Sequence, residues 1–115
     1  MEIAITPHPD DVLVLSITGS VDSLNADQLT SAFALPIGEG RQRLVADFAQ
    51  VNYTSSAGLR SLLITVKECR RAGGDLRLAA LQPQVERVLS IAGFTAILKV
   101  YTDVPSAVAS FGDAD

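Results

Sequence analysis

The spacing of apolar and polar positions predicts alternating strands and helices along the chain. Runs of β-branched and apolar residues, five to seven positions long, predict strands at residues 2–6, 12–18, 44–48, 76–81 and 97–101. The strongest helical pattern lies at residues 57–72, where Leu59, Leu62, Leu63 and Val66 follow the i, i+3, i+4, i+7 spacing of one apolar face. Weaker patterns of the same period predict three further helices.

Capping residues and helix breakers set the ends of these three helices. Asp22 or Ser23 is a suitable cap for the first of them, which carries Ala26, Leu29 and Phe33 on one face and is expected to be ended by Pro36 and the Gly38-Glu39-Gly40 run. Pro83 begins the second, with its apolar side chains expected to face inward at Val85, Val88, Leu89 and Ala92. Asp103 caps the last helix, which runs to about Phe111 and is followed by a polar tail expected to fray.

The resulting order, ββαβαβαβα, predicts an α/β fold in a single domain over residues 1–115. A turn rich in proline and aspartate at residues 7–11 joins the first two strands as an antiparallel hairpin. The later strands are separated by helices and are expected to run parallel through right-handed connections. The sequence therefore predicts a mixed sheet with helices packed against it.

Composition excludes several classes of function. The net charge is −4 and the basic residues are dispersed, so no basic face for nucleic acid is expected. Cys69 is the only cysteine and His8 the only histidine, and neither has the neighbours that catalysis or metal binding requires. We therefore expect no enzyme activity and no cofactor. No apolar run approaches the roughly 20 residues of a membrane helix, so we expect a cytoplasmic protein, and the charge and scattered polar faces fit a monomer.

A pair of serines stands where the third strand's loop enters the strongest helix. Ser55 or Ser56 is a natural helix cap, because a serine oxygen accepts an otherwise unpaired amide of the first turn. The same position also stabilises an anion, so a phosphate on Ser56 would meet free amides and the positive end of the helix dipole. Gly58 follows two residues later and removes side-chain bulk where another backbone could approach.

Two aspartates are further candidates for this site. Asp47 lies near the carboxyl end of a buried strand, where open α/β sheets place their binding sites, so we expect it close to the serine pair. Asp22 follows the neighbouring strand. Each carboxylate could equally serve only to cap a loop.

Five segments, in this order and spacing, resemble the STAS domain family and within it the bacterial anti-sigma factor antagonists. The clearest is Tyr53–Leu59, which is similar to the family's aromatic-x-D-S-[ST]-G-[LI] signature. Gly19–Asp22 resembles its G-x-[LV]-D step. The other segments are an apolar strand that ends in Asp, the connection after the signature helix, and a late helix with a small-Gly-apolar end: Leu44–Phe48, Arg71–Leu78 and Pro83–Phe94.

The resemblance implies a switch between partners. In the family, the unphosphorylated domain binds an anti-sigma factor that is also a serine kinase, and phosphorylation of the serine at position Ser56 releases it; a PP2C-type phosphatase resets the switch. The family's usual Asp is Ser55 here, which leaves Ser55 as an alternative acceptor, and Ala57 replaces its usual Ser or Thr. The implied partner-binding residues are Asp22, Asp47, Thr54, Ser55, Ser56, Gly58 and Leu59.

Other uses of the same fold are compatible with these residues. One is a STAS domain in a different partner-switching circuit, such as secretion or a two-component output. Another is an accessory domain of a transporter complex that is never phosphorylated. A third is direct nucleotide binding near Asp22 and Asp47.

Overall fold

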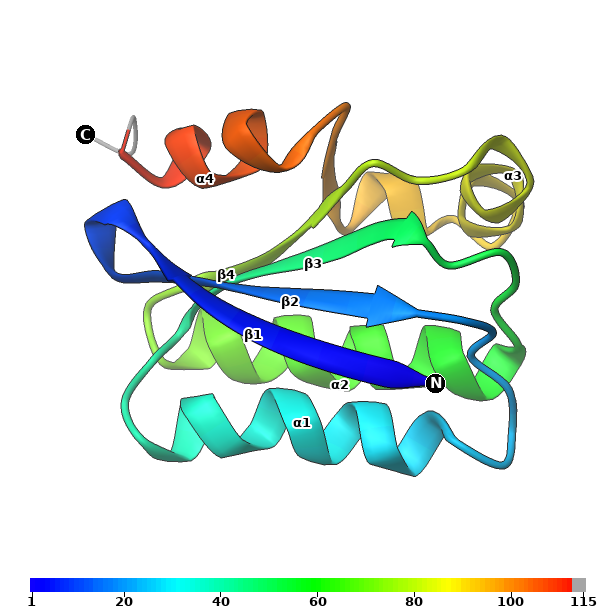
Figure 1. Ribbon diagram of the computed structural model, residues 1–115, viewed down its shortest axis with the longest axis horizontal. Coiled ribbons are helices and arrows are strands. Elements are labelled where there is room, and N and C mark those ends of the chain that lie inside the picture. Colours follow the sequence, from blue (N-terminus) through cyan, green and yellow to red (C-terminus); the bar gives the residue numbers. More distant parts are fainter. Residues whose placement is uncertain (113–115) are drawn as a thin grey trace.

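Five strands form one mixed sheet in the computed structural model, which describes residues 1–112 (Figure 1). In chain order, the strands are β1 (Glu2–His8), β2 (Val12–Thr18), β3 (Arg43–Gln50), β4 (Asp75–Ala79) and β5 (Lys99–Tyr101). The helices are α1 (Ala26–Gly38), α2 (Ser56–Arg71), α3 (Pro83–Ile91) and α4 (Val104–Gly112), with 3₁₀ turns at η1 (Pro9–Asp11) and η2 (Phe94–Ala96). The predicted ββαβαβαβα order is confirmed; the tail beyond Gly112 lies outside the described residues.

The strands lie side by side in chain order, from β1 at one edge to β5 at the other. β1 and β2 are antiparallel because only the three-residue turn η1 joins them, and its Asp10 and Asp11 take positive φ angles of 63° and 62°. β2, β3, β4 and β5 are parallel, since a helix crosses over between each pair. All four parallel strands therefore end at the same edge of the sheet, and their connecting loops gather there.

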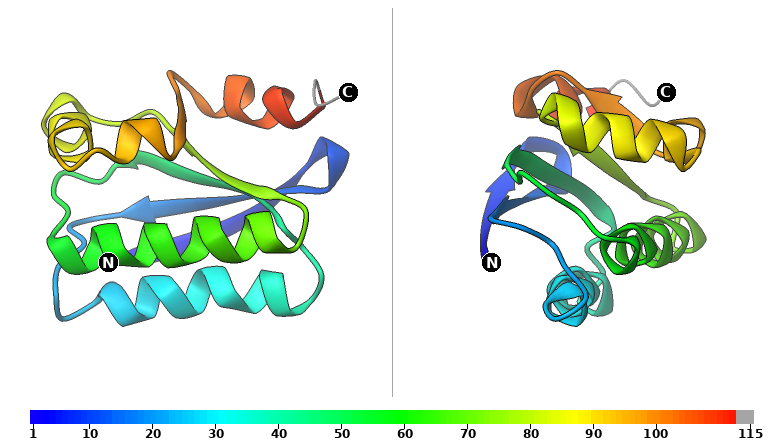
Figure 2. Two further views of the ribbon diagram at one scale, coloured as in Figure 1. Left: turned by 180° about the vertical axis from the view of Figure 1, so that it is seen from behind. Right: turned by 90° about the vertical axis from the view of Figure 1, so that its right-hand side faces the viewer.

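Two apolar layers cover the sheet (Figure 2). α1 and α2 lie against one face, where they bury Leu15 of β2, Phe48 of β3 and Leu78 of β4 in the larger core. α4 lies against the other face and packs on a smaller cluster: Val12, Val14, Val45, Ala79, Ala107, Val108 and Phe111. Successive residues of β3 therefore point into different layers. This alternation decides on which face of the sheet the side chain of Asp47 lies.

Several boundaries and one helix face differ from the sequence-based expectations. β1 continues to His8, β3 spans Arg43–Gln50, and β4 spans Asp75–Ala79 and so ends before Leu81. α1 continues through Pro36 to Gly38, because a proline in the last turn removes only one helical hydrogen bond and Pro36 is buried against the core. Val88 on α3 and Ala92, the residue that caps its end, are exposed, since only Val85 and Leu89 of this nine-residue helix are buried in the core. β5 begins only at Lys99, because the amides of Ile97 and Leu98 donate back to the Phe94 carbonyl of η2.

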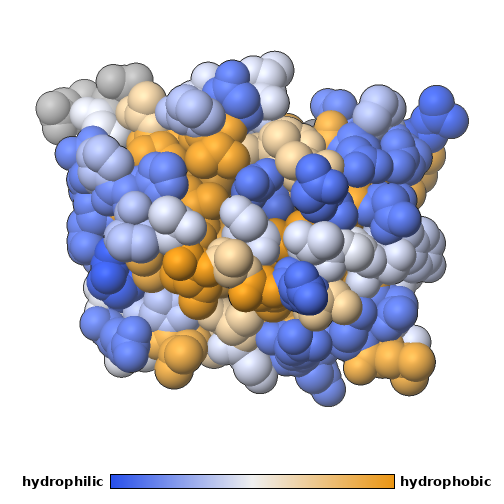
Figure 3. Space-filling model, in the orientation of Figure 1, coloured by the Kyte–Doolittle hydropathy of each residue, from blue (hydrophilic) through white to orange (hydrophobic). Residues whose placement is uncertain are grey.

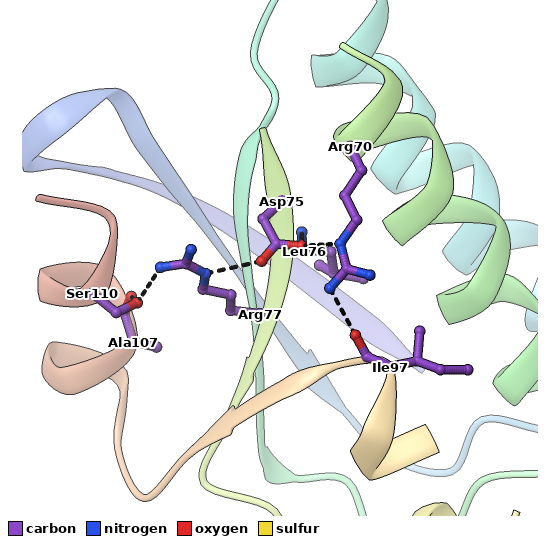
Figure 4. A network of polar contacts seen from close by, with 7 residues as sticks. All are labelled: Arg70, Asp75, Leu76, Arg77, Ile97, Ala107 and Ser110. Carbon is purple, nitrogen blue, oxygen red and sulfur yellow. Dashed lines mark hydrogen bonds and ion pairs between the residues drawn. The ribbon is translucent and has the colours of Figure 1, made fainter. Parts of the chain in front are cut away.

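The most extensive ionic contacts lie at the amino end of β4, far along the strand from its carboxyl-end loops. Buried Asp75 accepts hydrogen bonds from Arg70 Nε at 2.9 Å and from Arg77 Nε at 3.1 Å (Figure 4). Arg77 also donates to Ser110 Oγ and lies 4.0 Å from the ring centre of Phe111, which ties α4 to the sheet. Arg70 donates to the Ile97 carbonyl on the other side. Each of the three charged side chains in this network has a hydrogen-bond partner within the domain, so we assign the network a structural role.

Candidate functional site

The candidate site is built from two loops at the carboxyl edge of the parallel strands, between β2 and α1 and between β3 and α2. A short parallel bridge pairs Val21 with Thr54 and extends the sheet beyond the ends of both strands. The Val21 amide donates to the Tyr53 carbonyl at 2.9 Å, and the Ser55 amide donates to the Val21 carbonyl at 2.8 Å. These bonds hold the serine pair directly against the β2–α1 loop.

The two serines have different environments. Ser55 is half-buried and caps α2: its Oγ accepts the Gly58 amide at 3.2 Å, and its carbonyl accepts the Leu59 amide. Ser56 is the first residue of the helix, and its side chain is exposed, with no hydrogen-bond partner among the described residues. The capping role that either serine could have filled thus belongs to Ser55, and the hydroxyl of Ser56 is left accessible.

Gly58 is required for packing inside the domain. It is buried in the first turn of α2, and a Cβ built there would overlap Thr54 Oγ1 and lie 2.8 Å from Val21 Cγ1. A side chain at this position would push α2 away from the Val21–Thr54 bridge that positions Ser55. The packing of the domain itself therefore requires a glycine at position 58. The sequence-based expectation was different, namely that Gly58 makes room for the backbone of another protein.

Asp22 organises the β2–α1 loop. Its Oδ1 accepts the Leu24 amide at 2.9 Å and the Asn25 amide at 3.1 Å, while its own amide donates to Asn25 Oδ1. α1 begins at Ala26 with Asn25 in the capping position, so the prediction of Asp22 or Ser23 as the helix cap is wrong. The reason is that Asp22 closes a separate turn just before the helix, a common use of Asp. This loop is the one bonded to the serine pair.

Asp47 lies in the last half of β3 and points away from α2. Its neighbours Ala46 and Phe48 belong to the core under α1 and α2, and Asp47 takes the opposite face. There its Oδ2 accepts from Ser16 Oγ at 3.2 Å and its Oδ1 accepts the Ala49 amide at 3.0 Å. Its hydrogen bonds therefore fix the end of β3 and do not reach the serine turn.

Two apolar side chains that the helix and strand patterns did not single out project from the site loops. Leu24 is 93% exposed in the β2–α1 loop, and Tyr53 is 53% exposed two residues before Ser55. Leu24 falls outside the apolar face of α1 (Ala26, Leu29 and Phe33), which is the one sequence feature that could have marked it. An exposed tyrosine is typical of the anchors of protein–protein interfaces, and the exposed leucine on the adjoining loop adds apolar surface that a partner could bury.

The other reactive side chains lie away from these loops. Cys69 is buried on α2, and burial raises the pKa of its thiol to about 12, with smaller contributions from the carboxylates of Asp75 and Glu68. His8 ends β1 at the opposite edge, paired with Val12. Among residues 1–112, no three His, Cys, Asp or Glu side chains are grouped so as to hold a metal, and no helix is long and apolar enough to cross a membrane.

Comparisons with known proteins identify related sequences and structures. The STAS domain model matches residues 4–107. BtrV of Bordetella bronchiseptica, named as an anti-sigma factor antagonist, is 38% identical over 105 residues, which cover 91% of this chain and 90% of BtrV. A crystal structure described as an anti-sigma factor antagonist of Thermotoga maritima superposes with a TM-score of 0.88 at 23% identity, covering 94% of this chain and 92% of that one.

The fold is also shared with a protein solved in a phosphorylated form. The phosphorylated Bacillus cell fate determinant SpoIIAA superposes with a TM-score of 0.73 at 16% identity, covering 96% of this chain and 99% of that one. At this identity the likeness concerns the fold.

Proposed function

Since the chain belongs to the STAS domain family, whose model matches residues 4–107, we propose that it is a cytoplasmic anti-sigma factor antagonist switched by phosphorylation of Ser56. In its unphosphorylated form it binds an anti-sigma factor that is also a serine kinase, and the sigma factor is released. Phosphorylation by that kinase dissociates the complex. A PP2C-type phosphatase then restores the binding form. The name of the 38% identical relative supports the antagonist function.

The observation that carries the choice of acceptor is the difference between the two serine hydroxyls. Ser56 is exposed at the first position of α2 and its hydroxyl has no partner in the described structure. The Ser55 oxygen already accepts the Gly58 amide, so a kinase that used it would have to break the helix cap. This difference favours Ser56 over Ser55 as the phosphate acceptor.

The position of Ser56 also explains how a phosphate can act without unfolding the domain. The amides of Ser56 and Ala57 lie in the first turn of α2, where a helix leaves its amide groups without internal acceptors. A phosphate on Ser56 adds about −1.5 to −2 charges next to these amides and to the positive end of the helix dipole. The fold is therefore expected to persist while the surface acquires a strong local charge.

Leu24 and Tyr53 supply the apolar part of the docking surface. Both are exposed in the loops that the Val21–Thr54 bridge holds together, and Tyr53 lies two residues before Ser55. A partner that buries these side chains would also enclose Ser56. Burying a doubly charged phosphate without a matched cation is costly, so the phosphorylated form is expected to be released.

Intact-mass analysis with the cognate kinase and ATP tests the acceptor. The wild-type chain and Ser55→Ala should each gain one phosphate, about 80 Da, whereas Ser56→Ala should gain none. Because Ser55→Ala removes the cap and not the acceptor, it serves as the matched control. Modification of Ser56→Ala together with loss of modification in Ser55→Ala would assign the phosphate to Ser55.

Binding measurements with the same kinase test the switch itself. Ser56→Ala should bind whether or not ATP is present, and Ser56→Asp should bind more weakly if charge is what releases the partner. Leu24→Ala and Tyr53→Ala should both weaken binding, since each removes exposed apolar surface that the partner would bury. Equal binding of Ser56→Ala and Ser56→Asp would contradict an electrostatic switch.

A further inference from the structure

Arg60 is the cation nearest in sequence to the serine pair, and it lies one helical turn after Ser56. Residues four positions apart on a helix are neighbours, with about 5–6 Å between their Cβ atoms. A helical side chain leans towards the amino end of its helix, so the surface that Arg60 covers lies over the turn that contains Ser56. The side chain of Arg60 is exposed, so its guanidinium is able to extend over that turn.

Arg60 is also the only cation in the segments that form the candidate site. These segments are the β2–α1 loop, the β3–α2 loop and the first two turns of α2, residues 19–25 and 51–63, and their only other charged side chain is Asp22. Asp22 is negative, and its Oδ1 already accepts two amides of its own turn, so it would repel a phosphate. A phosphate on Ser56 therefore has one candidate counter-ion on these segments.

The other cations of α2 do not compete for this role. Arg70 and Arg71 each bind a carboxylate at 2.9 Å. Lys67 is exposed, but it lies about 16 Å from Ser56 along the helix axis. By contrast, Arg60 has no ion pair or hydrogen bond within residues 1–112, so its charge is available to a phosphate.

The start of α2 lies in a solvated part of the surface, where only a nearby charge can act on a phosphate. This start is at the right-hand end of the molecule in Figure 1, and the space-filling view shows hydrophilic side chains at that end beside an apolar projection (Figure 3). In water with 0.1 M salt the field of an exposed charge fades over about 10 Å. Arg60, one turn from Ser56, lies within this range, and Lys67 lies beyond it.

From these features we propose that Arg60 pairs with the phosphate on Ser56 and holds it against the first turn of α2. This inference rests on the proposed function, because it presupposes a phosphate on Ser56. An arginine can donate two parallel hydrogen bonds to a phosphate, and an acidic group four residues before a basic one is the more stabilising order on a helix. The free amides of the first turn are then available to the remaining phosphate oxygens.

The pairing also determines the charge that a partner meets beside Ser56. Before phosphorylation the first two turns of α2 carry a charge of +1, which comes from Arg60 alone. With a phosphate on Ser56 they carry about −0.5 to −1, so the sign of the charge reverses. One guanidinium cancels only part of the phosphate charge, and release of the partner is therefore still expected. Arg60 is thus a positioning residue for the phosphate of the phosphorylated form.

Titration of the phosphate by phosphorus NMR tests the pairing. The chain is prepared with phosphoserine incorporated in place of Ser56 during translation, so the test does not depend on a kinase. Arg60→Gln should raise the second pKa of the phosphate by about 0.3 or more at low salt, because the dianion loses its counter-ion. Arg60→Lys keeps the positive charge and should retain most of the effect. Arg60 is exposed, so neither substitution disturbs the core.

Lys67→Gln is the matched control, because it removes the same charge from the same helix at a distance where salt screens it. It should leave the pKa of the phosphate unchanged, and salt at about 1 M should remove the difference between the wild type and Arg60→Gln. The same pKa in the wild type and Arg60→Gln, or an equal change in Lys67→Gln, would overturn the proposal. Failure of the proposed function is seen separately, since the kinase would then leave Ser56 unmodified in the intact-mass analysis, whatever the titration gives.

Discussion

Replacing the two neighbouring serines by alanine should have different consequences for stability, a loss at Ser55 and little change at Ser56. Ser55→Ala removes the Oγ that accepts the Gly58 amide at 3.2 Å, and it leaves that amide without a partner at the start of α2. Loss of a serine cap costs about 1 kcal/mol, within a range of roughly 0.5–2 kcal/mol. Ser56→Ala removes an exposed hydroxyl that has no partner in the described structure, and alanine is the better helix former.

The expected difference is large enough to measure. We expect Ser55→Ala to lower the free energy of unfolding by about 1 kcal/mol, which corresponds to a drop in Tm of roughly 4 °C for a domain of this size. Ser56→Ala should stay within about 0.5 kcal/mol of the wild type. Urea denaturation followed by far-UV circular dichroism measures both, provided that the m-values of the variants agree.

A third variant tests whether capping of α2 requires serine at position 55 or any side chain that can accept the Gly58 amide. Ser55→Asp restores the residue that the family usually has, and its carboxylate can accept the same Gly58 amide. The negative charge at the helix start adds about 0.3–1 kcal/mol at low salt, so this variant should be at least as stable as the wild type. The reasoning would be refuted if Ser56→Ala cost more than Ser55→Ala, or if Ser55→Asp were as unstable as Ser55→Ala.

Three further predictions follow from the backbone and the core. Gly58→Ala should cost about 1–3 kcal/mol of stability, because its Cβ overlaps Thr54, whereas the control Gly38→Ala, with no atom within 4 Å, should be neutral or stabilising by thermal melting. Ala80→Gly should raise Tm slightly, since Ala80 holds a φ of 61° that strains any residue with a Cβ; a lower Tm would argue against strain there. Native Cys69 should resist thiol reagents until urea exposes it. The pKa of the Cys69 thiol rises from 9.0 to about 12 on folding, so the contribution of Cys69 to stability is complete below pH 9 and is lost as the pH rises towards 12. Denaturation of the wild type and of Cys69→Ala at two pH values should show this loss.

Much of the fold could be predicted from the local pattern of apolar and polar residues, because burial in the core determines that pattern. Strands such as residues 12–18 and 44–48 are covered on both faces, so their side chains are almost continuously apolar, and the helix that begins at Ser56 presents one clear apolar stripe. The hairpin and the parallel order follow from the lengths of the connections. What the pattern predicts well is therefore whatever contacts the core.

Sequence-based prediction was less reliable where the role of a residue depends on the path of the chain or on tertiary packing. Asp22 and Asn25 both favour helix starts, and only the chain path shows that Asp22 closes the preceding turn while α1 begins after Asn25. Pro36 is a helix breaker in general, yet its burial in the last turn of α1 offsets one lost bond. Asp47 lies near the predicted edge of the sheet, but the alternation of side chains along β3 sends it to the other face.

The same dependence on packing explains why serine can stand where the family usually has aspartate. Ser55, the position before the proposed acceptor, caps α2 and holds its first turn against the Val21–Thr54 bridge. Serine and aspartate perform that task about equally well, so the exchange preserves the geometry of Ser56 while it removes one negative charge beside it. In the proposed switch, the phosphate then supplies all of the negative charge at the start of the helix, because the first turn of α2 contains no acidic residue. The contrast between the bound and released states should therefore be greater in this chain than in a variant with aspartate at position 55.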